Sequence, residues 1–117
     1  MKYPIFPVAK PRMTRRDKWR QRPCVMKYRA FKDECRLHGI YIPQAGAHII
    51  FHVPMPKSWP KKKRIESCGK AHRQRPDIDN YCKALLDAIY EEDSGVWDIR
   101  ITKVWSETGA IEVRNLD

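Results

Sequence analysis

The sequence has no long apolar run, which excludes one broad class of proteins. No stretch approaches the roughly 20 consecutive apolar residues that a membrane-spanning helix needs. Residues 1–9 contain two prolines and lack the continuous apolar segment of a secretory signal peptide. We therefore expect a cytoplasmic protein with no membrane partner.

Closely spaced cysteine pairs are also missing. The cysteines are Cys24, Cys35, Cys68 and Cys82, and none of them forms a C-x-x-C pair. Their spacing matches no standard zinc motif. Cys68 and His72 are four residues apart, which would bring two metal ligands together on a helix. The simpler expectation is four reduced thiols in ordinary positions.

The composition is that of a globular chain. Of its 117 residues, 42% are hydrophobic and 32% are charged, which is unlike a disordered protein. This length predicts one domain over residues 1–117, with a modest core that self-association would help to stabilise. The net charge of +10 and the pI near 9.7 predict a polyanionic partner. Nucleic acid is the first candidate, and an acidic membrane surface is the second.

The charge is divided unevenly along the chain. Residues 1–76 contain 20 Lys and Arg against 4 Asp and Glu, whereas residues 77–117 contain 4 against 10. Nineteen of the 24 basic residues fall in two blocks, Lys10–Arg36 and Lys57–Arg75. Both blocks are too polar to form core. They are either solvated loops or phosphate-binding segments, and their density favours phosphate binding.

Each basic block also carries a tryptophan. Trp19 lies in the first block and Trp59 lies in the second, and either indole could stack on an exposed base. The candidate DNA contacts in these blocks are Lys10, Arg12, Arg15, Arg16, Lys61, Lys62, Lys63, Arg73 and Arg75.

The hydrophobic pattern predicts an α+β fold. Strands are expected at 3–9, 47–53, 96–105 and 110–115, helices at 27–38 and 78–91, and loops at 11–26 and 54–76. The last two strands should form a hairpin around Thr108 and Gly109. The prediction is a single small domain in which two main helices form one layer on a mixed β-sheet.

A compact group of charged residues starts the second predicted helix. If the backbone stays extended through Asp77, Ile78 and Asp79, both carboxylates face one side and the isoleucine faces the core. Lys83 follows Asp79 by four residues, so it projects toward the same region. Carboxylates that hold Mg²⁺ beside a phosphate, with a lysine to stabilise negative charge, provide what phosphodiester hydrolysis requires.

Asp93 lies beyond the far end of the same helix. If residues 79–93 were helical throughout, Asp79 and Asp93 would be roughly 20 Å apart. The helix must therefore end early and the chain fold back, or the third acid must come from elsewhere. Each residue also has a structural interpretation: Asp77 or Asp79 as a helix cap, Lys83 as a solvated ion-pair partner, and Asp93 as a turn residue.

Two stretches carry a family resemblance. His72–Ile89 reads H-R-Q-R-P-D-I-D-N-Y-C-K-A-L-L-D-A-I, and Glu91–Asp98 reads E-E-D-S-G-V-W-D. Together they resemble the D-x-D-N-x-x-K-x-x-x-D-A core and the acidic turn of the RusA family of Holliday-junction resolvases. The opening P-V-A-K-P-R resembles the N-terminal segment of that family. Lys103 resembles a lysine on the following strand, and we add it to the candidate DNA contacts.

The resemblance implies an enzyme and a site. Asp77, Asp79 and Asp93 would be metal-binding catalytic acids, and Lys83 would be the catalytic lysine. The cofactor would be Mg²⁺, with Mn²⁺ as an alternative. A RusA-like homodimer would nick two strands of four-way or branched DNA symmetrically, in a phage or prophage recombination role. Glu92 departs from the family pattern, because an aspartate often precedes the third acid, so Glu92 is an alternative to Asp93.

Two other functions are compatible with the same charges. A non-catalytic DNA-binding module would explain the basic blocks, but the acidic cluster would repel phosphate unless a cation neutralised it. A protein that binds an acidic protein partner would bind DNA weakly and with little dependence on salt.

Overall fold

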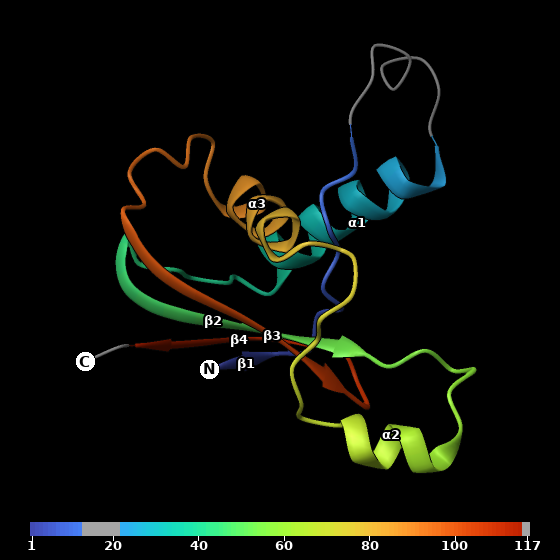
Figure 1. Ribbon diagram of the computed structural model, residues 1–117. Coiled ribbons are helices and arrows are strands. Elements are labelled where there is room, and N and C mark those ends of the chain that lie inside the picture. Colours follow the sequence, from blue (N-terminus) through green and yellow to red (C-terminus); the bar gives the residue numbers. More distant parts are fainter. Residues whose placement is uncertain (13–21, 116–117) are drawn as a thin grey trace.

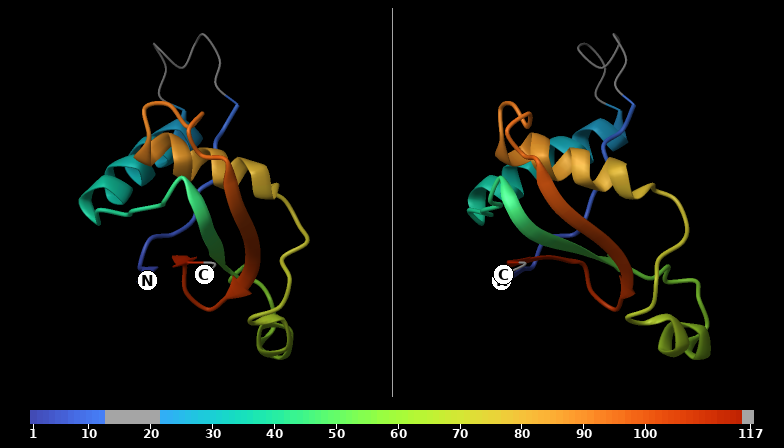
Figure 2. Two further views of the ribbon diagram at one scale, coloured as in Figure 1. Left: turned by 90° about the vertical axis from the view of Figure 1, so that its left-hand side faces the viewer. Right: turned by 60° about the vertical axis from the view of Figure 1, so that its left-hand side comes forward.

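The computed structural model describes residues 1–12 and 22–115, which form one mixed sheet and three helices. The elements in chain order are β1 (Lys2–Tyr3), α1 (Pro23–Leu37), β2 (Ala45–Pro54), α2 (Lys61–Ser67), α3 (Ile78–Ile89), β3 (Asp98–Ser106) and β4 (Ala110–Asn115). Helices α1 and α3 cover one face of the sheet, and α2 lies beyond the end of the sheet, away from both of them (Figures 1 and 2). The α+β class and the mixed sheet agree with the sequence prediction. The prediction of only two main helices omitted α2.

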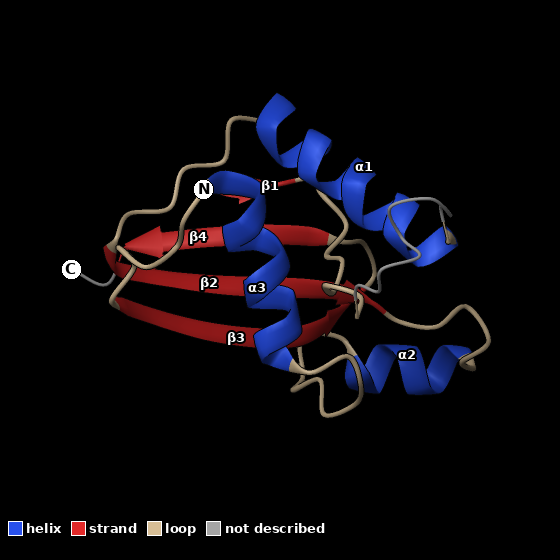
Figure 3. Cartoon of the chain, turned by 90° about the horizontal axis from the view of Figure 1, so that it is seen from above, coloured by secondary structure: helices blue, strands red, loops and turns tan. Residues whose placement is uncertain are grey.

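Strand β2 is the centre of the sheet, whose strand order is β1-β4-β2-β3 (Figure 3). It pairs with β3 in parallel and with β4 in antiparallel orientation. Ala47, Ile49 and Phe51 on its inner face have no exposed surface. This strand therefore gains the most hydrophobic stabilisation from having a neighbour on each side. The predicted hairpin between residues 96–105 and 110–115 is therefore wrong, because β2 lies between the two strands.

Helix α3 forms because its apolar residues recur on one face. Tyr81, Leu85 and Leu86 are buried there, and the small residues Ala84 and Ala88 allow close packing. Helix α1 packs against α3. None of the helices in the described part of the chain is long and apolar enough to cross a membrane.

Helix α2 lies inside the segment 54–76, which was predicted from the sequence to be a loop. Its residues K-K-K-R-I-E-S are mostly good helix formers, but none of them is buried. A helix without an apolar face gives no hydrophobic periodicity, which is why the prediction missed it. Arg64 holds the helix in place, since its guanidinium donates to the Pro56 carbonyl (2.8 Å) and to Glu107 (3.3 Å).

The N-terminal strand is shorter than the predicted 3–9. It ends at Tyr3 because Pro4 has no N–H group with which to continue the ladder. The chain then runs toward α3, where the Lys10 amide donates to the Asn80 carbonyl (3.0 Å). This bond places the start of the first basic block beside the first turn of α3. The first helix also starts earlier than predicted, at Pro23, which suits the first position of a helix.

Candidate active site

Asp77 is the N-cap of α3, but its side chain does not act as a cap. Its backbone is extended (φ −67°, ψ 150°), and its carboxylate makes no capping hydrogen bond. The amides of Asn80 and Tyr81 instead bond to the Asp77 carbonyl (3.1 and 3.4 Å). The exposed carboxylate is therefore not used for helix capping, and the capping interpretation of Asp77 does not hold.

Asp79 is already within the first turn of α3, where the helix dipole favours a negative charge. The prediction of an extended backbone through Asp79 is wrong, because the helix begins at Ile78. Ile78 is 37% exposed, so it does not face the core as predicted. Asp79 itself is exposed.

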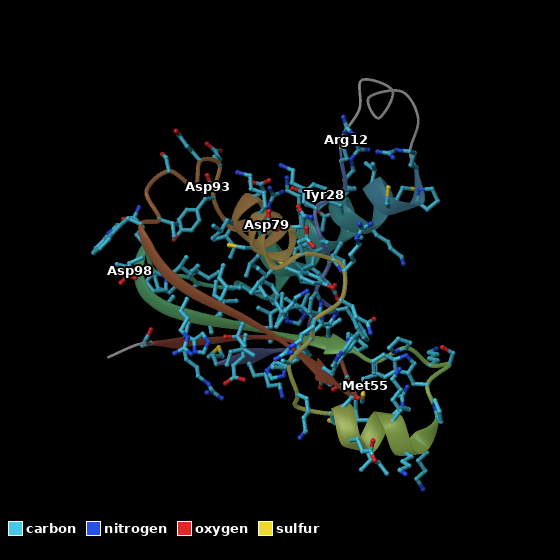
Figure 4. The ribbon with its side chains drawn as sticks, viewed as in Figure 1. Arg12, Tyr28, Met55, Asp79, Asp93 and Asp98 are labelled. Carbon is cyan, nitrogen blue, oxygen red and sulfur yellow. The ribbon has the colours of Figure 1, made fainter. Side chains whose placement is uncertain are left out.

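The chain after α3 folds back and returns Asp93 to the helix. Helix α3 ends at Ile89, and Lys83 donates to the Asp93 carboxylate at 3.2 Å. Lys83 is one turn after Asp79 on the helix. Asp79, Lys83 and Asp93 therefore follow one another from the first turn of α3 to the returning turn. Figure 4 shows Asp79 on α3 and Asp93 on the turn that follows it. The helix ends early and the chain folds back, and this brings Asp93 to Lys83.

The charges in this group influence each other. The hydrogen bond that Lys83 donates to Asp93, with the negative charges of Asp87 and Asp93, raises the pKa of Lys83 above its usual value. Burial raises the pKa of the Cys82 thiol to about 11, and the charges of Asp93 and Asp79 add to the rise. Cys82 therefore lies within the field of both acids, and Lys83 remains a cation at neutral pH.

Asp87 joins the N-terminal segment to this group. Its carboxylate accepts hydrogen bonds from Lys10 (2.6 Å) and from Tyr28 of α1 (3.2 Å), and Lys83 lies 3.9 Å away. Burial and Asp87 raise the pKa of Tyr28 to about 12, so the phenol stays protonated and donates. Lys10, predicted as a DNA contact, is instead paired inside the protein. In the sequence, Asp87 was indicated only by the D-A pair that ends the core motif. Nothing in the sequence indicated that Tyr28 contacts this group.

Lys103 also has a role that the sequence did not reveal. Its ammonium group donates to the backbone carbonyls of Gln74 (2.6 Å) and Pro76 (2.7 Å), directly before Asp77. Because the side chain starts from β3, it ties the approach to α3 to the edge of the sheet. Lys103 therefore supports the backbone before Asp77. The sequence had predicted a DNA contact, but the ammonium group is not free.

The segment that precedes Gln74 and Pro76 pairs with β3 at the edge of the sheet. Ala71 forms an antiparallel bridge with Val104. The Gly69 amide donates to the Trp105 carbonyl (2.7 Å), and the Trp105 amide donates to the Lys70 carbonyl (3.0 Å). The approach to Asp77 is therefore fixed at its start by backbone bonds and at its end by Lys103.

The RusA resemblance implies DNA cutting, and we expect Lys103→Met to slow it about tenfold, because the loss of two charge-assisted bonds lets the segment before Asp77 move. Lys103→Arg should restore much of the rate, since a guanidinium can also donate to two carbonyls. Single-turnover cutting at saturating protein would measure the step, with the junction dissociation constant measured in parallel. If Lys103→Met weakened only binding, Lys103 would be a DNA contact.

The other predicted DNA contacts divide into two groups. Arg73 and Arg75 are exposed on the approach to Asp77, and Arg12 is exposed within the first basic block. Lys61, Lys62 and Lys63 are exposed on α2, far from α3 (Figure 1). Arg15, Arg16 and Trp19 lie outside the described residues. Of these residues, Arg73 and Arg75 directly precede the acids at the start of α3.

The acids only partly form the predicted metal site. Within residues 1–12 and 22–115, no three His, Cys, Asp or Glu side chains lie close enough to hold one metal ion. Asp77, Asp79 and Asp93 therefore do not converge on one point. Their donor chemistry nevertheless fits Mg²⁺, which is usually held by one or two carboxylates together with waters and substrate phosphate. Asp79 and Asp93 both lie close enough to Cys82 to raise the pKa of its thiol.

Cys68 and His72 do not form a zinc site. His72 is only 4% exposed and stacks on Trp105 with ring centroids 3.9 Å apart, whereas Cys68 is exposed. Burial and the charge of Lys103 lower the pKa of His72, so the imidazole is neutral at pH 7. His72 is therefore a packing residue, and all four cysteines are free thiols.

Comparison with known proteins identifies the family of the chain. The family model described as Endodeoxyribonuclease RusA matches residues 3–114, nearly the whole chain. The chain belongs to the RusA endodeoxyribonuclease family. One relative, "Uncharacterized protein YqaN" of Bacillus subtilis (strain 168), is 40% identical over 68 residues, and the match covers 51% of this chain. The chain spans about half of that relative, since the match covers 48% of its length. No solved structure matches the chain significantly.

Membership in the RusA family places the motif residues in context. Asp77, Asp79 and Lys83 lie at the start of α3, and the fold-back brings in Asp93. Glu92, the alternative third acid, is exposed and accepts a hydrogen bond from Ser94 (3.1 Å). Because Asp93 contacts Lys83 and Glu92 does not, Asp93 is the better candidate for the third carboxylate.

Proposed function

We propose that this RusA-family chain is a Mg²⁺-dependent endodeoxyribonuclease that resolves four-way and similar branched DNA by paired nicks. The observation that carries the proposal is the Lys83–Asp93 contact of 3.2 Å. It joins a helix that starts with two acids to a turn that supplies a third acid. Mn²⁺ is an alternative cofactor, because it accepts similar oxygen ligands.

The residues of this site have separate roles in the proposed hydrolysis. Asp79 and Asp93 would hold the cation, and Asp77 would supply a further carboxylate to it. A bound Mg²⁺ supplies charge neutralisation and lowers the pKa of water. The water oxygen bonds to phosphorus as the bond from phosphorus to the 3′ oxygen breaks, which leaves a 5′-phosphate and a 3′-hydroxyl. Lys83, a cation at neutral pH, would stabilise the charge that builds up on the phosphate.

The site also needs to receive the DNA backbone. Arg73 and Arg75 are exposed directly before Asp77, so they can bind the phosphates that flank the cut. A homodimer would provide two such sites, and its two-fold symmetry matches that of a four-way junction. Paired nicks would follow from one cut by each protomer.

The proposal predicts cutting that depends on branch structure and on metal. The full chain would be incubated with an end-labelled four-way junction and with a matched linear duplex, with magnesium or with EDTA. We expect paired symmetric nicks in the junction alone, lost with EDTA. Asp77→Asn should abolish cutting and leave junction binding intact, because the backbone that starts α3 is unchanged. Loss of binding together with cutting would contradict a purely catalytic role.

The second candidate is a non-catalytic DNA-binding module. It is favoured by one observation, that three acids do not converge on a common point in the described residues. If the chain bound junctions tightly but cut none with magnesium or manganese, this function would replace the first. Binding that was weak and insensitive to salt would instead indicate an acidic protein partner.

A further inference from the structure

Trp97 is the most exposed tryptophan of the described residues. Its side chain is 78% exposed, although burial of an indole is usually favourable. No ring contact is formed by Trp97 in this part of the chain. An indole held in water carries a cost that a partner surface would remove.

The backbone of Trp97 is fixed on both sides. The Trp97 amide donates to the Gln44 carbonyl (3.0 Å), and the Val96 amide donates to the Asp93 carbonyl (3.0 Å). A Cβ atom on Gly95 would lie 2.5 Å from the Gln44 side chain, so this turn packs closely on the chain before β2. The indole therefore projects from a held backbone and not from a loose loop.

The other described tryptophans are already occupied. Trp59 packs edge-on against Trp105 (4.8 Å between ring centroids), and the ammonium group of Lys63 lies 4.1 Å from the centre of the Trp59 ring. Trp105 is 8% exposed. The predicted use of Trp59 for base stacking is therefore wrong, because its ring is used to hold α2 against the sheet.

Trp97 belongs to the same turn as Asp93, which contacts Lys83. Figure 4 shows this turn between the labelled Asp93 and Asp98. The indole is therefore carried by the same turn that supplies Asp93 to the proposed site. Glu92, Asp93 and Asp98 surround it in the sequence, so a phosphate is a poor fit, whereas a nucleobase carries no charge and offers an apolar face.

We propose that Trp97 stacks on an unpaired or unstacked base at the branch point of the DNA. Bases inside a duplex are already stacked on both faces, so only a branch, bulge or fork offers an open face. Trp97 would thus help the chain to prefer branched DNA over linear duplex. This rests on the proposed function for the DNA substrate, but it requires no cutting.

A photochemical crosslink tests this directly. The full chain would be bound, with EDTA present, to a four-way junction carrying 5-iodouracil at the branch point or in the middle of an arm. We expect irradiation to crosslink the branch-point base to Trp97, identified by mass spectrometry, and the arm base to give no such product. A branch-point base that crosslinks only elsewhere would overturn the proposal.

Substitutions give an independent measure of the same contact. Trp97→Ala should weaken junction binding about 5- to 150-fold, the range expected for the loss of one base–aromatic stack. Linear duplex binding should change little. Trp97→Phe should retain most of the preference, whereas Trp97→Leu, apolar but not aromatic, should not. Tyr41→Ala removes another exposed aromatic side chain (70% exposed) and should leave junction binding unchanged.

Other results would contradict the proposal in recognisable ways. If Trp97→Ala converted a dimer to a monomer by sedimentation, Trp97 would lie in a subunit interface. Equal loss of junction and duplex binding would mean that the indole reads no unpaired base. Failure of the wild type to cut DNA with magnesium would count against the proposed nuclease alone, since the crosslink is measured without metal.

Discussion

Replacing Lys83 with methionine is expected to slow DNA cutting at least about 100-fold while junction binding remains. The reason is that Lys83 would stabilise charge that develops only as the phosphodiester reacts, and the removal of one such group typically costs that much. Methionine keeps the apolar length of the side chain and favours a helix, so α3 should remain folded. Single-turnover cutting at saturating protein would measure the loss.

The raised pKa of Lys83 also predicts how cutting depends on pH and on Lys83→Arg. Asp93 and Asp87 favour the charged form, so the ammonium stays protonated at neutral pH and above. We therefore expect Lys83 to act as a cation and not as a general base, so Lys83→Arg should keep part of the activity. If the rate instead rose with pH as Lys83 lost its proton, the lysine would be acting as a base and this role would be wrong. Lys32→Met, which removes a lysine from α1, is a matched control.

The central elements of the fold could be predicted because their residues repeat with a clear period. The pattern of Tyr81, Leu85 and Leu86 defines α3, and the alternation around Ile49 and Phe51 defines β2. Neighbour relations were harder to predict. The turn-like Thr108-Gly109 pair favours a hairpin between β3 and β4. In the structure β2 lies between these strands and pairs with both of them. Gly109 instead leaves room for Phe6, whose ring would lie 2.3 Å from an added Cβ.

The candidate site was only partly readable from sequence for a similar reason. Asp77, Asp79 and Lys83 are close along the chain, so helix geometry alone relates them. Asp93 reaches Lys83 only because the chain reverses after Ile89, and no local pattern fixes that path. Lys103 is further still, and a lone lysine on a strand cannot be distinguished from a DNA contact until its acceptors at Gln74 and Pro76 are known.

Trp105→Ala is expected to lower the free energy of unfolding by about 3 to 5 kcal/mol, the usual cost of truncating a buried tryptophan. The indole is 8% exposed and packs between Trp59 and His72. Its loss would therefore weaken the attachment of α2 and of the segment that leads to Asp77. Urea denaturation would measure the change, and amide exchange should show the largest loss of protection from Gly69 to His72.

Trp97→Ala provides the matched control, because it deletes the same side chain from an exposed position. We expect its unfolding free energy to stay within about 0.5 kcal/mol of the wild type. The two variants should therefore behave in opposite ways: Trp105→Ala unfolds early, and Trp97→Ala folds normally but binds junctions weakly. Equal stability of the two variants would mean that the Trp59–Trp105–His72 stack does not hold the approach to Asp77. Cutting should also slow in Trp105→Ala below its unfolding transition, because Asp77 is reached through the segment that this stack supports.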